Sequence, residues 1–114
     1  NILRDVVAKF KGASYEFSVY EQYRNMMDVI KDCSFIMDYA EEAMQRAGVT
    51  ALPHIIRGGT DGSRLSFMGM PCPNIFTGEM AIHSKHEYVS VQDMQKAVDT
   101  LIHLSQIWEE KAEG

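Results

Sequence analysis

The segment Thr77–Tyr88 contains the residues best suited to metal chemistry. It carries His83 and His86, and Glu87 directly follows the second histidine. Neutral imidazole is the commonest protein ligand for zinc, but a zinc centre needs at least three protein ligands. The spacing also differs from H-E-x-x-H, which places two histidines four residues apart on a helix. From residue types alone, a zinc ligand and ordinary surface histidines both stay open.

A second candidate site is the polar, glycine-rich loop Arg57–Ser63, which follows the apolar run Leu52–Ile56. Ligands of α/β folds bind where strands end in loops, and glycines there let the backbone approach a ligand. The loop matches neither of the nucleotide motifs G-x-x-x-x-G-K-S/T and G-x-G-x-x-G. A tight turn capped by Asp61 is the structural alternative. Arg57 is more informative, because a guanidinium at the end of an apolar strand needs an anionic partner and suits a carboxylate bidentately.

The other histidines and the two cysteines are expected to be structural. His54 lies within the apolar run, and His103 lies within a predicted helix. Cys33 and Cys72 have no general base beside them and form neither a C-x-x-C pair nor a zinc-finger spacing. We therefore expect buried thiols at these positions rather than nucleophiles or a disulfide framework.

These groups must be positioned by an alternation of helices and strands. Apolar residues recur at helical spacing over Ile2–Phe10, and Gly12 stands where a helix would stop. Over Tyr15–Val19 the period changes to two, which predicts an antiparallel strand with one exposed face. A helix is then predicted from an N-cap at Asp32 to a stop at Gly48. Its buried stripe would consist of Phe35, Ile36, Tyr39, Ala40, Ala43, Met44 and Ala47.

The second half of the chain continues this alternation. Leu52–Ile56 predicts a buried strand, Leu65–Met68 a short helix, and Asn74–Thr77 a second short strand. A long helix starts at Ser90, where Asp93 completes a capping arrangement three residues on. Its expected apolar face is Val91, Met94, Val98, Leu101, Ile102 and Trp108. This order predicts an α/β layer in which helices cover a sheet.

The composition is that of one soluble globular domain. The 114 residues are 46% apolar and 24% charged, which argues against intrinsic disorder. The formal charge of −5 has the wrong sign for binding nucleic acid or an anionic membrane. No apolar run approaches the ~20 residues that cross a bilayer. We expect a cytoplasmic protein and, because Asn1 lies within a predicted helix, a piece of something longer.

A series of motifs follows in a fixed order along the chain. They are Tyr23-Arg24-Asn25-Met26, Ala43-Met44, Ile56-Arg57-Gly58-Gly59-Thr60-Asp61-Gly62, Leu65-Ser66-Phe67-Met68-Gly69, Pro71-Cys72-Pro73-Asn74, His83 and Lys85-His86-Glu87-Tyr88-Val89-Ser90. In this order and spacing they resemble the C-terminal part of tripeptide aminopeptidases, which belong to the dinuclear-zinc aminopeptidase and carboxypeptidase family. The resemblance covers nearly the whole chain.

The resemblance implies an α/β fold built from parts of two domains. Residues 28–114 would be the returning half of a zinc-peptidase catalytic domain, with helices on a mixed sheet. Residues 1–27 would be the last helix and strand of an inserted α+β lid, and the composition also changes near residues 25–30. The implied cofactor is a pair of zinc ions. The implied partners are a short peptide substrate, the N-terminal half of the same protein and, in a homo-oligomer, further copies.

The resemblance assigns His83 as a zinc ligand. His83 matches the last zinc-binding histidine of the loop G-G-x-N-x-H-G-K-H-E. Here the corresponding residues are Gly78-Glu79-Met80-Ala81-Ile82-His83-Ser84-Lys85-His86-Glu87. Glu79, Ala81 and Ser84 therefore replace the second glycine, the asparagine and the glycine after the ligand. The general base and the other ligands would lie outside this chain, which would contain no catalytic residue.

The resemblance assigns the glycine-rich loop to substrate binding. Arg57 matches the arginine of I-R-G-G-T-D-G, where it would hold a peptide carboxylate or order the loop. Gly58, Gly59, Thr60 and Asp61 complete this predicted subsite. Arg64 is a weaker candidate, because some relatives carry an amide there.

The implied reaction is zinc-assisted peptide hydrolysis, in which two metal ions polarise the scissile carbonyl and activate a water molecule. Two other functions are open. One is a related peptidase or acylase of the same fold. The other is a non-catalytic α/β module that binds a peptide or a partner subunit.

Overall fold

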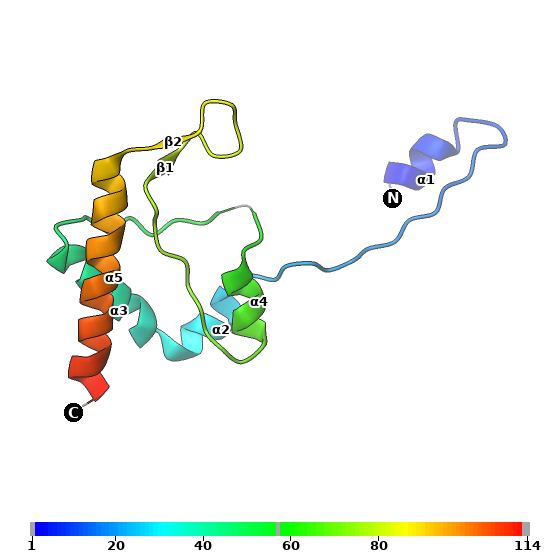
Figure 1. The fold of residues 1–114 in the computed structure, drawn as a ribbon. Coiled ribbons are helices and arrows are strands. Elements are labelled where there is room, and N and C mark those ends of the chain that lie inside the picture. The colour runs from blue at the N-terminus through cyan, green and yellow to red at the C-terminus, as the bar shows by residue number, and fades with distance from the viewer. Residues whose placement is uncertain (1, 57, 113–114) are drawn as a thin grey trace.

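The computed structural model describes residues 2–56 and 58–112. Within these ranges the chain forms helices and one small sheet (Figure 1). The order of elements is α1 (Ile2–Val7), α2 (Met27–Ile30), the 3₁₀ helix η1 (Lys31–Cys33), α3 (Phe35–Arg46), α4 (Asp61–Phe67), β1 (Glu79–Met80), β2 (Tyr88–Val89) and α5 (Val91–Ala112).

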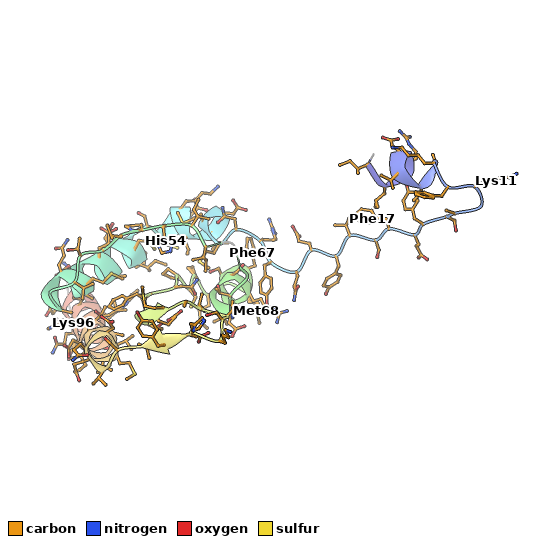
Figure 2. All side chains as sticks on the ribbon, turned by 90° about the horizontal axis from the view of Figure 1, so that it is seen from above. Lys11, Phe17, His54, Phe67, Met68 and Lys96 are labelled. Atoms are coloured by element: carbon orange, nitrogen blue, oxygen red, sulfur yellow. The ribbon has the colours of Figure 1, made fainter. Side chains whose placement is uncertain are left out.

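The N-terminal segment lies apart from the rest of the molecule. Helix α1 ends at Val7, earlier than predicted, and Gly12 follows in a turn with φ +81°. An extended arm then leads to the main body (Figures 1 and 2). The radius of gyration is 20.4 Å, against about 13 Å for a compact chain of this size.

The strand predicted over Tyr15–Val19 is not formed. Val19 is 81% exposed on one face of the alternating pattern and Tyr20 is 89% exposed on the other, so neither face is covered. A strand requires backbone partners on a neighbouring strand, and the part of the chain that the structure describes places none beside this arm. The alternation of apolar and polar residues is present, but such a segment forms a strand only where a neighbouring strand pairs with it.

Helix α3 confirms most of the predicted apolar stripe, although Phe35 at its start is 45% exposed. Ile36, Ala40 and Ala43 are buried, and Gly48 ends the helix with φ +70°. The start differs from the prediction, because α3 begins at Phe35 and Asp32 lies in η1. The backbone stays helical through the junction between η1 and α3, so no extended N-cap residue is present there.

Helix α3 packs against α5, and this contact forms the main core. Ile107 and Thr100 of α5 are completely buried. The Trp108 ring packs edge-on against Phe35 and Tyr39, with centroid distances of 5.9 and 5.2 Å. The ion pair of Arg46 with Glu110 (2.7 Å) and a hydrogen bond from Lys96 Nζ to the Ala47 carbonyl (2.6 Å) close the edges of the interface.

Of the apolar residues predicted for α5, Trp108 contacts α3, but the other five lie on a different face of the helix from the buried Thr100 and Ile107. The predicted residues are 45–71% exposed: Val91, Met94, Val98, Leu101, Ile102 and Trp108. At about 100° per residue, the first five lie about 100–180° around the helix from Thr100 and Ile107. Helix α5 therefore has two apolar faces, and only one is covered within the described residues.

The two strands predicted around the glycine-rich loop are also absent. Leu52 is 79% exposed and Ile55 92% exposed, and Asn74–Thr77 is irregular as well. The sheet seen in the described residues is instead an antiparallel pair, in which Glu79 of β1 faces Val89 of β2. Buried strands need neighbours on both sides, and these runs have none here. The result is a mixed arrangement of helices with a small two-stranded sheet, compatible with the α/β class.

No helix in the described ranges has both the length and the apolar character needed to cross a bilayer.

Candidate functional site

The β1–β2 hairpin carries His83 in the loop that joins its two strands, and this loop projects from the helical body (Figure 1). The loop needs left-handed backbone at two non-glycine residues, Ala81 (φ 54°) and His83 (φ 62°). Gly78 precedes β1 with φ +87°, and a Cβ at this position would overlap the side chain of Asp93. The hairpin is therefore fixed closely against the N-terminus of α5.

A small set of hydrogen bonds closes the loop around His83. The His83 backbone N–H donates to Glu87 Oε2 at 2.7 Å. The Glu87 N–H donates to the Ser84 carbonyl at 3.1 Å, and the His86 N–H donates to Ser84 Oγ at 3.1 Å. These bonds hold the backbone of His83 while its side chain is exposed to solvent.

His83 can provide one metal ligand, and the described part of the chain does not complete a site. In residues 2–56 and 58–112, no group of three or more His, Cys, Asp or Glu side chains could hold a metal ion. The imidazole of His83 makes no hydrogen bond or ion pair within these residues, so a ring nitrogen is available to an external metal. The donor chemistry fits zinc, but a single nitrogen cannot form a zinc centre.

The glycine-rich loop is organised around the N-terminus of α4. Arg57 lies outside the described residues. A Cβ at Gly59 would overlap the Tyr23 ring, whereas a Cβ at Gly58 would meet no atom within 4 Å. Thr60, not Asp61, is the N-cap, because its Oγ1 accepts from the Ser63 N–H at 3.4 Å. The predicted helix is thus longer than Leu65–Met68 and starts at Asp61.

Polar side chains inside α4 tie this loop to distant segments. Ser63 Oγ donates to the Arg24 carbonyl at 2.6 Å. Ser66 Oγ donates to the Gly62 carbonyl at 2.7 Å and accepts from the Cys72 N–H at 3.0 Å. Both serines are buried. The α4 N-terminus is therefore fixed between the end of the arm and the Cys72 segment.

A shallow groove lies beside α4, where the arm meets the body. Its volume is about 260 Å³, and its lining includes Tyr23, Arg24, Arg64, Phe67 and Met68. The guanidinium of Arg24 lies 4.2 Å from the centroid of the Phe67 ring. That of Arg64 lies 5.2 Å from the Tyr23 centroid. Figure 2 shows Phe67 and Met68 at this junction.

The stacking of Arg24 was not foreseen from the sequence. The only signal was its place in the Tyr23-Arg24-Asn25-Met26 motif. Arg64, predicted as a weaker substrate-binding candidate, is engaged with an aromatic ring instead of standing free. Within the described residues, no hydrogen bond, ion pair or ring contact joins this region to the His83 loop.

The remaining histidines and cysteines occupy structural or solvent-exposed positions. His54 is exposed, with Nδ1 3.3 Å from the Leu52 carbonyl oxygen, because the strand expected to bury it is absent. His103 is half-buried on α5 and contacts Gln106 at 3.1 Å. Cys33 and Cys72 are free thiols and half-buried, less covered than expected.

Comparison with known proteins finds relatives named Peptidase T. A protein named Peptidase T from Latilactobacillus sakei is 42% identical over 106 residues, which is 93% of this chain and 26% of the relative. Peptidase T of Shewanella sediminis is 48% identical over 101 residues, 89% of this chain and 25% of the relative. Peptidase T of Aeromonas hydrophila is 51% identical over 92 residues, 81% and 23% respectively.

The chain thus spans about a quarter of the length of the curated relatives that it matches. No protein-family model matches it.

Proposed function

We propose that the chain, which is similar to proteins named Peptidase T over most of its length, forms part of a zinc-dependent tripeptide aminopeptidase, which removes the N-terminal residue of short peptides. The observation that carries this proposal is the 42% identity to a Peptidase T over 93% of the chain. The ordered motifs around Arg57 and His83 fall within this similarity. The cytoplasm is the proposed compartment, which suits two free cysteines.

His83 is the metal-binding residue in this proposal. Its imidazole is exposed, lacks a protein partner within the described residues and lies on a loop whose backbone is held by hydrogen bonds. A zinc ion bound there would polarise the scissile carbonyl and lower the pKa of the attacking water. The role of His83 itself is to hold this ion as a neutral imidazole.

In this proposal, the rest of the zinc site corresponds to parts of the relatives that do not align with this chain. The chain covers 23–26% of the three relatives compared, which leaves ample length for further ligands, a second zinc ion and the general base. Residues 28–114 are proposed to belong to the catalytic domain and residues 1–27 to the lid. The separation of α1 from the main body supports such a division (Figure 1).

Substrate binding is assigned to Arg57, Gly58, Gly59, Thr60 and Asp61. The open space at Gly58 supports this role, since no atom lies within 4 Å of a Cβ placed there. The packing of Gly59 beneath Tyr23 and the Thr60 cap fix the loop from the other side. The bidentate guanidinium of Arg57 is suited to a peptide carboxylate.

A chimeric enzyme tests the function. The matching segment of Latilactobacillus sakei Peptidase T is replaced by this chain, and release of the N-terminal residue from a tripeptide is measured. We expect turnover that falls at least about 100-fold in His83→Ala and is unchanged in His103→Ala, the matched control on α5. A folded chimera that His83→Ala leaves fully active would contradict the proposal.

A further inference from the structure

We propose that Glu87 is a positioning residue for His83: its carboxylate fixes the His83 backbone in the conformation that presents the imidazole for metal binding. This inference rests on the proposed function, in which His83 is a zinc ligand. It concerns a carboxylate that would not touch metal or substrate.

The first argument is the conformation of His83. Its φ of 62° is left-handed, a conformation that is unfavourable for a residue with a Cβ. Such a conformation persists only where the surrounding structure holds it. The loop around His83 is exposed over residues 81–89, so packing does not supply that restraint.

The second argument is the bond that Glu87 makes. Its Oε2 accepts the His83 N–H at 2.7 Å, a length typical of charge-assisted hydrogen bonds. Glu87 is itself fixed, because its N–H donates to the Ser84 carbonyl and the next residue, Tyr88, begins β2. The carboxylate therefore links the backbone of His83 to the start of β2 and holds it in a fixed position within the hairpin.

A second carboxylate in the hairpin provides a matched control. Glu79 lies in β1, is exposed like Glu87 and forms no hydrogen bond to the loop within the described residues. Removing the charge of Glu79 changes the local electrostatics of the hairpin and leaves the bond to His83 intact.

The test uses the chimeric enzyme and two measurements besides turnover. Zinc affinity is measured by competition with a chelator, and hydrogen exchange of the His83 amide is measured in the metal-free protein. We expect Glu87→Ala to weaken zinc binding about 10–100-fold and to speed exchange of that amide. Glu87→Gln, which keeps an acceptor oxygen at the same reach, should stay within about fivefold of the parent. Glu79→Gln should match the parent.

Glu87→Asp distinguishes the effect of side-chain length from the effect of the negative charge. It keeps the carboxylate but shortens the side chain, so we expect it to behave like Glu87→Ala. Two results would overturn the positioning role, provided that His83→Ala still loses zinc. One is equal zinc affinity in Glu87→Ala and the parent, and the other is an equal loss of affinity in Glu87→Ala and Glu87→Gln. Unchanged zinc affinity in His83→Ala would instead overturn the proposed function, and this inference with it.

Discussion

The two apolar faces of α5 should differ sharply in their contribution to stability. Ile107 faces α3 and is 0% exposed, whereas Ile102 lies on the opposite face and is 51% exposed. The substitutions Ile107→Ala and Ile102→Ala remove the same atoms from the same helix. Their effects on helix propensity are equal, so the difference between them reports burial alone.

The expected magnitudes follow from these exposures. Isoleucine to alanine removes three carbon groups, each worth about 0.8 kcal/mol when fully buried. At Ile107 this loss is about 2.4 kcal/mol, and the cavity left against α3 raises it to about 3 kcal/mol. At Ile102 half of the surface is already exposed and no cavity forms, so we expect a loss of about 1 kcal/mol.

Urea unfolding followed by tryptophan fluorescence measures both losses. Trp108 is the single tryptophan and sits against Phe35 and Tyr39 at the α3–α5 contact, so its emission reports separation of these helices. With a slope of about 1.5 kcal/mol/M, Ile107→Ala should lower the midpoint by about 2 M. Ile107→Val, with an expected loss of about 1 kcal/mol, serves if the alanine variant does not fold.

Equal losses at Ile102 and Ile107, or a larger loss at Ile102, would refute this reasoning. Such a result would show that the outer face of α5 is covered in solution. Repeating the melt over a range of protein concentrations then tells whether a second copy covers it, because only association makes the midpoint depend on concentration.

Three further predictions concern single positions. Gly62→Ala should destabilise the chain by about 1–3 kcal/mol, because its Cβ would overlap the Cys72 carbonyl; Gly58→Ala, in open space, should stay within about 0.5 kcal/mol of the parent, and equal losses in urea melts would contradict the packing. Ala81→Asn should stabilise the hairpin by about 0.5–1 kcal/mol in the same assay, because Asn tolerates the left-handed φ of 54° better than Ala; a loss of stability would count against this conformation. Arg46 hydrogen-bonds Glu110 and so lowers the pKa of that carboxyl. The parent should therefore be more stable than Glu110→Gln at neutral pH, and this advantage should vanish as the pH falls through the lowered pKa. An advantage that persists in acid would contradict the ion pair.

Features of the helices were predicted correctly from the sequence where the residues that determine them lie close together in the chain. Most of the apolar stripe of α3 and the stop at Gly48 were predicted as found, with Phe35 as the exception. The cap of α5 also formed, since the Asp93 N–H donates to Ser90 Oγ at 3.0 Å and Ser90 Oγ donates to Asp93 Oδ2 at 2.7 Å. In each case successive determining residues are at most four positions apart in the chain.

The strands could not be predicted, because they depend on partners elsewhere. Tyr15–Val19 and Leu52–Ile56 have strand patterns, but no neighbouring strand lies beside them in the described residues. The hairpin of β1 and β2 was not predicted, although its two strands are close together in the chain, because its turn lacks a recognisable sequence signal. Its turn uses left-handed residues other than glycine, Ala81 and His83, and neither residue type signals that conformation.

The candidate site was predicted in its residues more than in its geometry. His83 was singled out by its motif, while the bond from its N–H to Glu87 has no sequence signal beyond a spacing of four residues. The family resemblance was confirmed by the relatives named Peptidase T. The ligand role of His83 and the substrate role of Arg57 stay predictions.

A zinc-loaded crystal structure of the chimeric enzyme tests the central claim most directly. Anomalous scattering at the zinc absorption edge locates the metal without any assumption about its ligands. The proposal predicts a ring nitrogen of His83 about 2.0–2.1 Å from a zinc ion, with the remaining ligands supplied by the Peptidase T segments. A fully occupied zinc centre in which the imidazole of His83 takes no part would contradict it.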